Sequence, residues 1–153
     1  MAKADTANVG AKPRKISAQP TVDSYRSAPM YVPIVDAVVS ILDSSNIVAP
    51  DDVLLRMGKL ARADRDAWRA GRVDFLERVI HGNLSQLRMF LRILRFHAHD
   101  LNLVPSLDTV RDTRGRPLRF TKNGEPRLER AYATRFTWPG RAPFPMDRAR
   151  PPG

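Results

Sequence analysis

The sequence contains no cysteine among its 153 residues. This absence excludes a disulfide framework, a thiolate metal site and a cysteine nucleophile, and it suits a reducing compartment. No apolar run approaches the roughly 20 residues that a membrane-spanning helix needs, so we expect no membrane partner. Residues 1–28 have no apolar stretch of the kind that marks a secretory signal. These absences predict a cytoplasmic location.

The sequence also lacks the short motifs of familiar catalytic sites. It has no GxGxxG fingerprint, no GxxxxGK[ST] phosphate loop and no GxSxG nucleophile turn. His97 and His99 lie two residues apart in an expected helix, so they point to different sides and cannot share a metal as a pair four apart would. We expect no cofactor, no metal site and no enzymatic activity. A small nuclease-like enzyme stays an alternative, because its acidic residues would be spread along the chain.

Negative charge is scarce relative to positive charge. The chain has 26 Lys and Arg against 16 Asp and Glu, which gives a formal net charge of +10. A charge of this size attracts polyanions, above all nucleic acid. The charge amounts to +3 over residues 1–28, +1 over 29–105 and +6 over 106–153. The central part of the chain is therefore nearly neutral, and the excess lies toward the two ends.

The sequence predicts a mainly α fold: a small bundle of about five helices with an appended basic β-hairpin, a short C-terminal helix and disordered termini. Four segments follow from this pattern. They are a flexible basic arm at 1–29, a helical body at 30–105, a basic hairpin with a helix at 106–138, and a Pro/Arg-rich tail at 139–153. The ends are assigned as flexible because they show no hydrophobic periodicity and are rich in small residues and proline.

Apolar residues at helical spacing indicate the helices of the body. We expect them around 35–42, from Pro50 onward, over 64–70, around 73–80 and over 84–100. The last of these is apolar on two sides, which is typical of a helix at the centre of a fold.

The chain changes character after Pro105. Thr109–Arg111 and Leu118–Thr121 are candidate strands, and the turn between them contains Gly115. Pro126 is well suited to the first turn of a short helix. We therefore expect a hairpin followed by a helix.

Arginines at helical spacing form the first candidate site. Arg88, Arg92 and Arg95 make a narrow band on the helix expected over 84–100. Three guanidinium groups in such a band can contact successive phosphates. The alternative is a solvated or salt-bridged face, for which four acids are possible partners: Asp64, Asp66, Asp74 and Glu77.

The turn at His81, Gly82 and Asn83 separates two expected helices, which allows a helix-turn-helix interpretation. The match is weak, because polar residues occupy positions that this motif fills with small or apolar ones. A tight turn between two core helices explains the same residues.

The expected hairpin is the second candidate site. Its basic residues lie on or beside turns: Arg111, Arg114, Arg116, Arg119 and Lys122. A two-stranded basic ribbon beside a helical body suits contact with a nucleic acid groove or backbone. Phe120 lies between these residues and is interpreted as a core anchor rather than a base-stacking platform.

Together these patterns predict a non-enzymatic nucleic-acid-binding protein, with DNA favoured over RNA. The predicted contacts are phosphate contacts from the C-terminal third and from the arginine band. The alternative is a protein-interaction subunit of a larger assembly, such as a ribonucleoprotein, whose Arg-rich arms order on an acidic partner. A second copy of the chain, in a homo-oligomer, is a further alternative partner.

Overall fold

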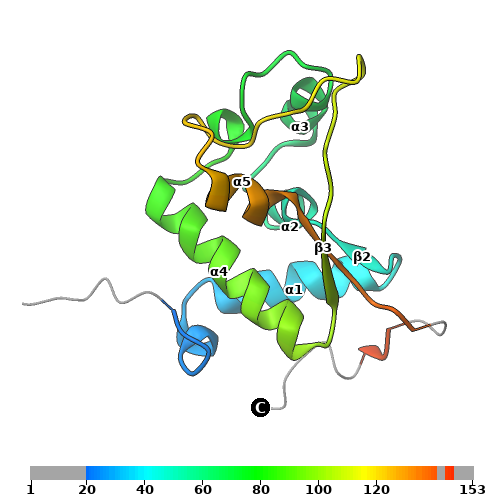
Figure 1. Cartoon of the computed structure of the whole chain (residues 1–153). Helices are drawn as coiled ribbons and strands as arrows, with labels where there is room; N and C mark the ends of the chain where they lie inside the picture. Colours follow the sequence, from blue (N-terminus) through cyan, green and yellow to red (C-terminus); the bar gives the residue numbers. More distant parts are fainter. Residues whose placement is uncertain (1–19, 141–143, 147–153) are drawn as a thin grey trace, which may run out of the picture.

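The computed structural model describes residues 20–140 and 144–146, in which one small sheet lies along one side of the helices (Figure 1). The described part contains five α-helices and a three-stranded antiparallel sheet, which confirms the predicted mainly α fold class. The flexibility expected of 1–19, 141–143 and 147–153 concerns residues outside the described ranges. In chain order the elements are η2 (Tyr25–Ser27), α1 (Tyr31–Leu42), β2 (Ile47–Val48), α2 (Pro50–Arg56), α3 (Arg62–Arg69), η3 (Leu76–Val79), α4 (Leu84–Asp100), β3 (Val104–Leu107), α5 (Pro126–Ala133) and β4 (Thr134–Thr137).

Helix α4 contributes seven buried residues to the core, among them Ile93 from the second of its two apolar sides. It begins with a capping box: the Asn83 side chain accepts from the Gln86 N–H at 2.9 Å, and the Gln86 side chain accepts from the Asn83 N–H at 3.2 Å. Ile93 is fully buried, and Phe90 and Leu94 are 1% exposed. Helix α4 contacts α1, η2 and α5. Buried side chains of this size contribute roughly 1.5–3 kcal/mol each, so α4 is a major source of stability.

The sheet joins the middle of the chain to its C-terminal third. Strand β4 is central, with β2 and β3 antiparallel on its two sides. Phe136 of β4 is in register with Val48 of β2 and with Pro105 of β3. Because α5 ends at Ala133 and β4 begins at Thr134, the central strand continues the helix without a loop.

The helix expected around 73–80 is reduced in the structure to the single turn η3. Two N–H groups of this turn donate to another segment: Leu76 to the Arg119 carbonyl at 3.1 Å, and Glu77 to the Phe120 carbonyl at 2.9 Å. These bonds replace those that would continue a helix. The helix-turn-helix interpretation therefore lacks its first helix.

The segment between β3 and α5 turns back at Gly115, as predicted, and backbone bonds join its two arms: the Asp112 N–H donates to the Arg116 carbonyl at 2.8 Å, and the Leu118 N–H donates to the Val110 carbonyl at 2.9 Å. Neither arm is a regular strand. Arg111 and Pro117 make one isolated bridge. Gly115 has a φ of 83°, a left-handed conformation that glycine adopts readily. Pro117 has no N–H to donate, and beyond Leu118 the carbonyls of Arg119 and Phe120 accept from η3, so the pairing of the two arms does not extend into a regular ladder. The predicted hairpin is thus present as a short, irregular hairpin held against the helical body.

Residues 20–29, assigned to the flexible arm from sequence, pack on the body. Tyr25 in η2 is only 3% exposed. Its ring centroid lies 5.6 Å from that of Tyr31 and 5.5 Å from that of Phe96. A single aromatic anchor has no periodicity, which is why the pattern of the sequence did not show it.

Candidate nucleic-acid interface

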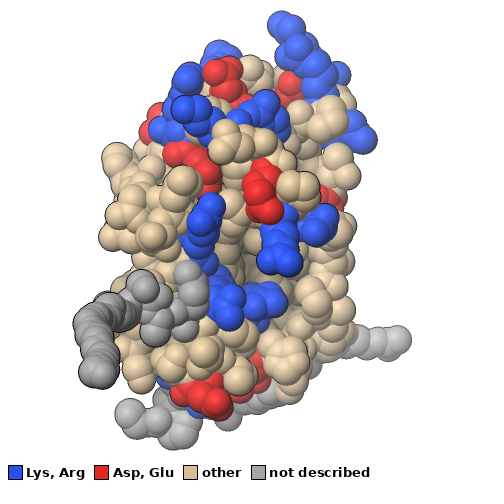
Figure 2. Space-filling view, turned by 60° about the vertical axis from the view of Figure 1, so that its left-hand side comes forward, with Lys and Arg blue, Asp and Glu red and all other residues tan. Residues whose placement is uncertain are grey.

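A groove of about 1260 Å³ lies between α4, α5 and β3, and we call it the arginine groove. Figure 2 shows a hollow in this face with Lys and Arg side chains gathered around it. One carboxylate, that of Glu125, is among the lining residues of the described part. The arginines that line the groove come from two helices: Arg88, Arg92 and Arg95 from α4, and Arg127 and Arg130 from α5.

The α4 side of the arginine groove is the band predicted from sequence. Arg88 and Arg95 are exposed, and Arg92 is half-buried. The guanidinium carbons of Arg92 and Arg95 lie 5.5 and 5.1 Å from the centre of the Phe96 ring, within the range of cation–π attraction. Arg92 Nε also donates to the carbonyl of Pro20. These contacts hold the two guanidinium groups at the wall of the groove.

The α5 side adds two arginines that sequence analysis did not single out. Arg127 and Arg130 are exposed and lie three residues apart, so they share one side of α5. The carboxylate of Glu125 caps this helix by accepting from the Leu128 N–H at 2.9 Å. The helix was expected from Pro126, and the arginine spacing was visible in the sequence. What the pattern could not show is that this side of α5 faces α4.

None of the five arginines of the arginine groove forms an ion pair within the described residues. Two of the acids that sequence analysis named as partners are engaged elsewhere. Asp74 pairs with Arg78 at 3.3 Å, and Glu77 accepts from the Tyr132 hydroxyl at 2.8 Å. Glu77 forms no ion pair with Arg88, although the Arg88 charge opposes the rise that burial causes in the pKa of Glu77. The other two lie on α3 and form no ion pair with the groove arginines in the part of the chain described. The positive charge of the groove is therefore open to an external anion.

Apolar side chains form the floor of the arginine groove. Leu94 and Phe136 are 1% and 5% exposed, so the floor continues into the hydrophobic core. Leu107 lines the groove from β3 and is 62% exposed. The remaining apolar lining includes Leu91, Phe96, Leu103, Leu128 and Ala131. The groove therefore combines an apolar floor with cationic walls.

The five basic residues predicted at the hairpin do not line the arginine groove. Arg116 Nε pairs with the Asp112 carboxylate at 3.1 Å, and hydrogen bonds to that carboxylate lower the pKa of Asp112. Arg111 donates to the Gly115 carbonyl at 3.0 Å. The guanidinium of Arg119 donates to backbone carbonyls, including that of Lys122. These three arginines bond within the loop itself, and all five basic residues are exposed.

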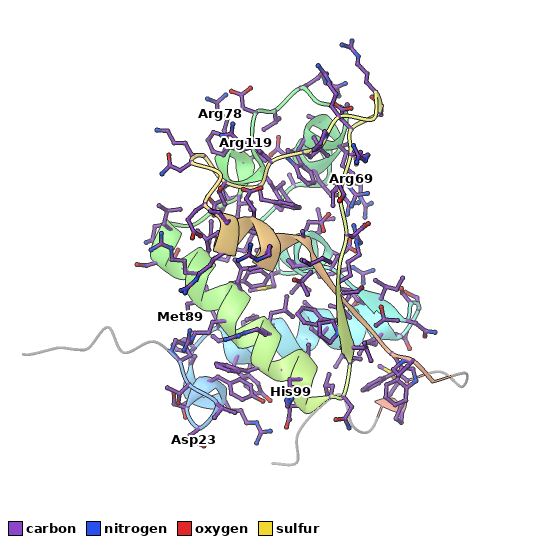
Figure 3. The ribbon with its side chains drawn as sticks, in the orientation of Figure 1. Asp23, Arg69, Arg78, Met89, His99 and Arg119 are labelled. Atoms are coloured by element: carbon purple, nitrogen blue, oxygen red, sulfur yellow. The ribbon has the colours of Figure 1, made fainter. Side chains whose placement is uncertain are left out.

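The arginine groove and the loop occupy different parts of the molecule. Figure 3 shows Arg119 and Arg78 toward one end, and His99 near the far end of α4. His99 is exposed and lines the groove together with the α4 arginines. The structure thus brings the α4 band together with α5 and leaves the hairpin residues apart from it.

Glu129 fixes α5 to the loop that precedes it. Its carboxylate accepts from the Phe120 N–H at 3.1 Å, from the Thr121 N–H at 2.7 Å and from the Thr121 hydroxyl at 2.6 Å. The Phe120 ring packs between Trp68 and Tyr132, with centroid distances of 5.1 and 5.3 Å. Phe120 is thus a core anchor, as predicted. This arrangement positions the α5 wall of the groove.

His97 lies on the buried side of α4. It is 1% exposed, and neither ring nitrogen has a hydrogen-bond partner among the described residues. Its ring meets that of Tyr31 edge-on at 5.7 Å. Burial lowers the pKa of His97 to about 4, although the Asp100 carboxylate opposes this effect. His97 is therefore neutral near pH 7, and it stands apart from the exposed His99.

Within the described residues, no helix is both long enough and apolar enough to cross a membrane. No group of three or more His, Asp or Glu side chains there is arranged to hold a metal ion. No protein family, curated protein or solved structure gives a significant match to the chain.

Proposed function

We propose that the protein binds nucleic acid in the arginine groove and catalyses no reaction. The observation that carries this proposal is the convergence of five arginines on two sides of one groove, none of them in an ion pair within the described residues. Guanidinium groups stay charged at physiological pH and match phosphate oxygens in a bidentate geometry. Arginines that neutralise phosphates in the groove would release the counterions condensed on the nucleic acid, which gives affinity without a requirement for sequence.

The extent of the basic surface supports contact with several phosphates. Arg88 and Arg95 are seven positions apart, which at 1.5 Å per residue is about 10 Å along α4. Figure 2 shows further Lys and Arg side chains toward one end of the same face. Figure 3 places Arg78 and Arg119 toward that end. A polyanion longer than the groove would meet positive charge beyond it.

Removing the two α5 arginines tests the proposal. In the Arg127→Ala/Arg130→Ala variant we expect the slope of log Kd against log salt to flatten by about 1.5–2, because two phosphate contacts are lost. At about 0.1 M salt this corresponds to a loss of affinity of roughly 30-fold. Fluorescence anisotropy with a labelled oligonucleotide over a salt series measures both quantities.

The matched control is Arg56→Ala/Arg62→Ala. It removes the same charge from two exposed arginines that do not line the arginine groove. We expect it to change the affinity less than threefold, since long-range effects of exposed charges are screened. Equal losses in the two variants would show that net charge, and not the groove, determines binding. The preference for DNA stays a prediction, which DNA and RNA oligonucleotides of one sequence compare directly.

A further inference from the structure

Binding of phosphate groups alone does not require the apolar floor of the arginine groove. A ligand that offers only phosphates is bound well by arginines on a flat or convex polar surface. Here the arginines stand beside apolar residues, and one of them, Leu107, is 62% exposed to solvent. Exposed apolar surface framed by polar residues marks a binding site for a ligand with apolar surface of its own. The complementary ligand therefore carries both negative charge and flat or apolar groups.

Two guanidinium groups of the arginine groove are already held against an aromatic ring. Those of Arg92 and Arg95 lie 5.5 and 5.1 Å from the centre of Phe96. Arg92 is further restrained by its bond to the Pro20 carbonyl. Planar guanidinium groups and aromatic rings are surfaces on which unpaired bases stack. Because these groups are restrained before binding, little conformational entropy would be lost when a base stacks there.

The combination of an apolar floor with cationic walls distinguishes a single-stranded from a double-stranded ligand. In a double helix the base faces are stacked on one another, and the phosphates lie on a convex exterior, so a duplex cannot bring base faces to a recessed apolar floor. In a single strand the bases are free to turn toward the floor while the phosphates meet the arginines on both sides. We infer that the arginine groove accommodates single-stranded nucleic acid in preference to duplex. This inference rests on the proposed function.

The first measurement compares a single-stranded oligonucleotide with the duplex of the same sequence and length, at equal salt and with the full chain. Charge alone favours the duplex, because its charge density is higher and its salt slope per contact is steeper. We expect the single strand to bind about tenfold more tightly. Equal or tighter duplex binding overturns the inference but leaves the proposed function standing. Failure to bind either oligonucleotide overturns both.

The second measurement uses a variant in which a large side chain covers the apolar floor of the groove. Ala131 is half-buried and lines the arginine groove, so Ala131→Trp places a large ring where a base would lie. We expect it to weaken single-strand binding about tenfold with an unchanged salt slope. The control is Ala63→Trp, at an exposed position of α3 outside the groove, which should bind as the parent does. An unchanged affinity in Ala131→Trp, once circular dichroism shows it to be folded, overturns the inference.

Leu107→Ser provides a floor variant that needs no repacking, because Leu107 is already 62% exposed. We expect about a threefold loss of single-strand affinity from the missing apolar contact. Polyglutamate of matched charge is then used as a competitor. Weak competition by polyglutamate supports recognition of bases. Competition as strong as that of the oligonucleotide overturns the inference and favours an acidic protein partner for the groove.

Discussion

Glu129→Ala is expected to lower the free energy of unfolding by about 3–5 kcal/mol. Its carboxylate accepts from two backbone N–H groups and one hydroxyl of Phe120 and Thr121. These two residues are 4% and 3% exposed, so water does not replace the lost acceptor. Each buried donor left without a partner costs about 1–3 kcal/mol. Urea denaturation followed by circular dichroism measures the change.

Glu125→Ala is the control for this prediction, because it truncates the same residue type four positions earlier, at the N-cap of α5. The Glu125 carboxylate is exposed and accepts from one N–H, that of Leu128. Loss of such a cap costs about 1 kcal/mol. If the two variants were destabilised equally, the bonds from Glu129 to the loop would contribute no more than an exposed cap. The result for Glu129→Ala also bears on binding, since α5 carries Arg127 and Arg130.

Acidification from pH 7 to pH 4 is expected to remove about 3 kcal/mol of stability through His97 alone. Burial lowers the pKa of His97 from 6.5 to about 4 in the folded state. Between these values the unfolded chain binds a proton that the folded chain does not. The stabilising contribution is therefore complete above pH 6.5 and is lost as the pH falls toward 4. The groups facing the ring are Tyr31, Asp100 and Arg26.

The His97→Leu variant separates this effect from the titration of carboxylates. The free energy of unfolding of the parent and of His97→Leu is measured by urea denaturation at several pH values between 7 and 4. The difference between them should change by about 3 kcal/mol across this range, with the variant less sensitive to acid. Parallel curves would contradict the assignment of His97 as a neutral buried ring. An imidazole NMR titration of the folded parent gives the pKa directly.

Local patterns predicted the helices better than any other part of the molecule. The helix expected over 84–100 is α4 with the same bounds, because its apolar spacing and its Asn83 cap are signals within one segment. Pro126 begins α5 for the same reason. The expected helix around 73–80 was not realised, because its backbone bonds go to residues more than forty positions later, Arg119 and Phe120. A periodicity within the segment carries no information about such partners.

Local sequence patterns could not predict the sheet or the arginine groove, because both are formed by residues far apart in the chain. Strand β2 has two residues, and Ile47 finds its partner in Thr137, ninety positions along the chain. Arg88 and Arg130 likewise line one groove only because the chain returns past α4. The arginine band on α4 was predicted from spacing, but its opposite side required the tertiary arrangement. The hairpin was predicted from its turn at Gly115, whereas the bonds that Arg111, Arg116 and Arg119 make within it depend on side-chain geometry that local charge does not show.

The position of β4 in the chain bears on when the protein becomes functional during synthesis. Strand β4 is the centre of the sheet, yet both strands that pair with it are translated earlier. The sheet therefore cannot assemble until residue 137 has left the ribosome, and pairing over such sequence separations makes folding slow. Helix α5, which adjoins β4, supplies one wall of the arginine groove, so a nascent chain displays the α4 arginines without their counterpart. Under the proposed function, ligand binding in the arginine groove therefore requires a chain that has been translated through residue 137.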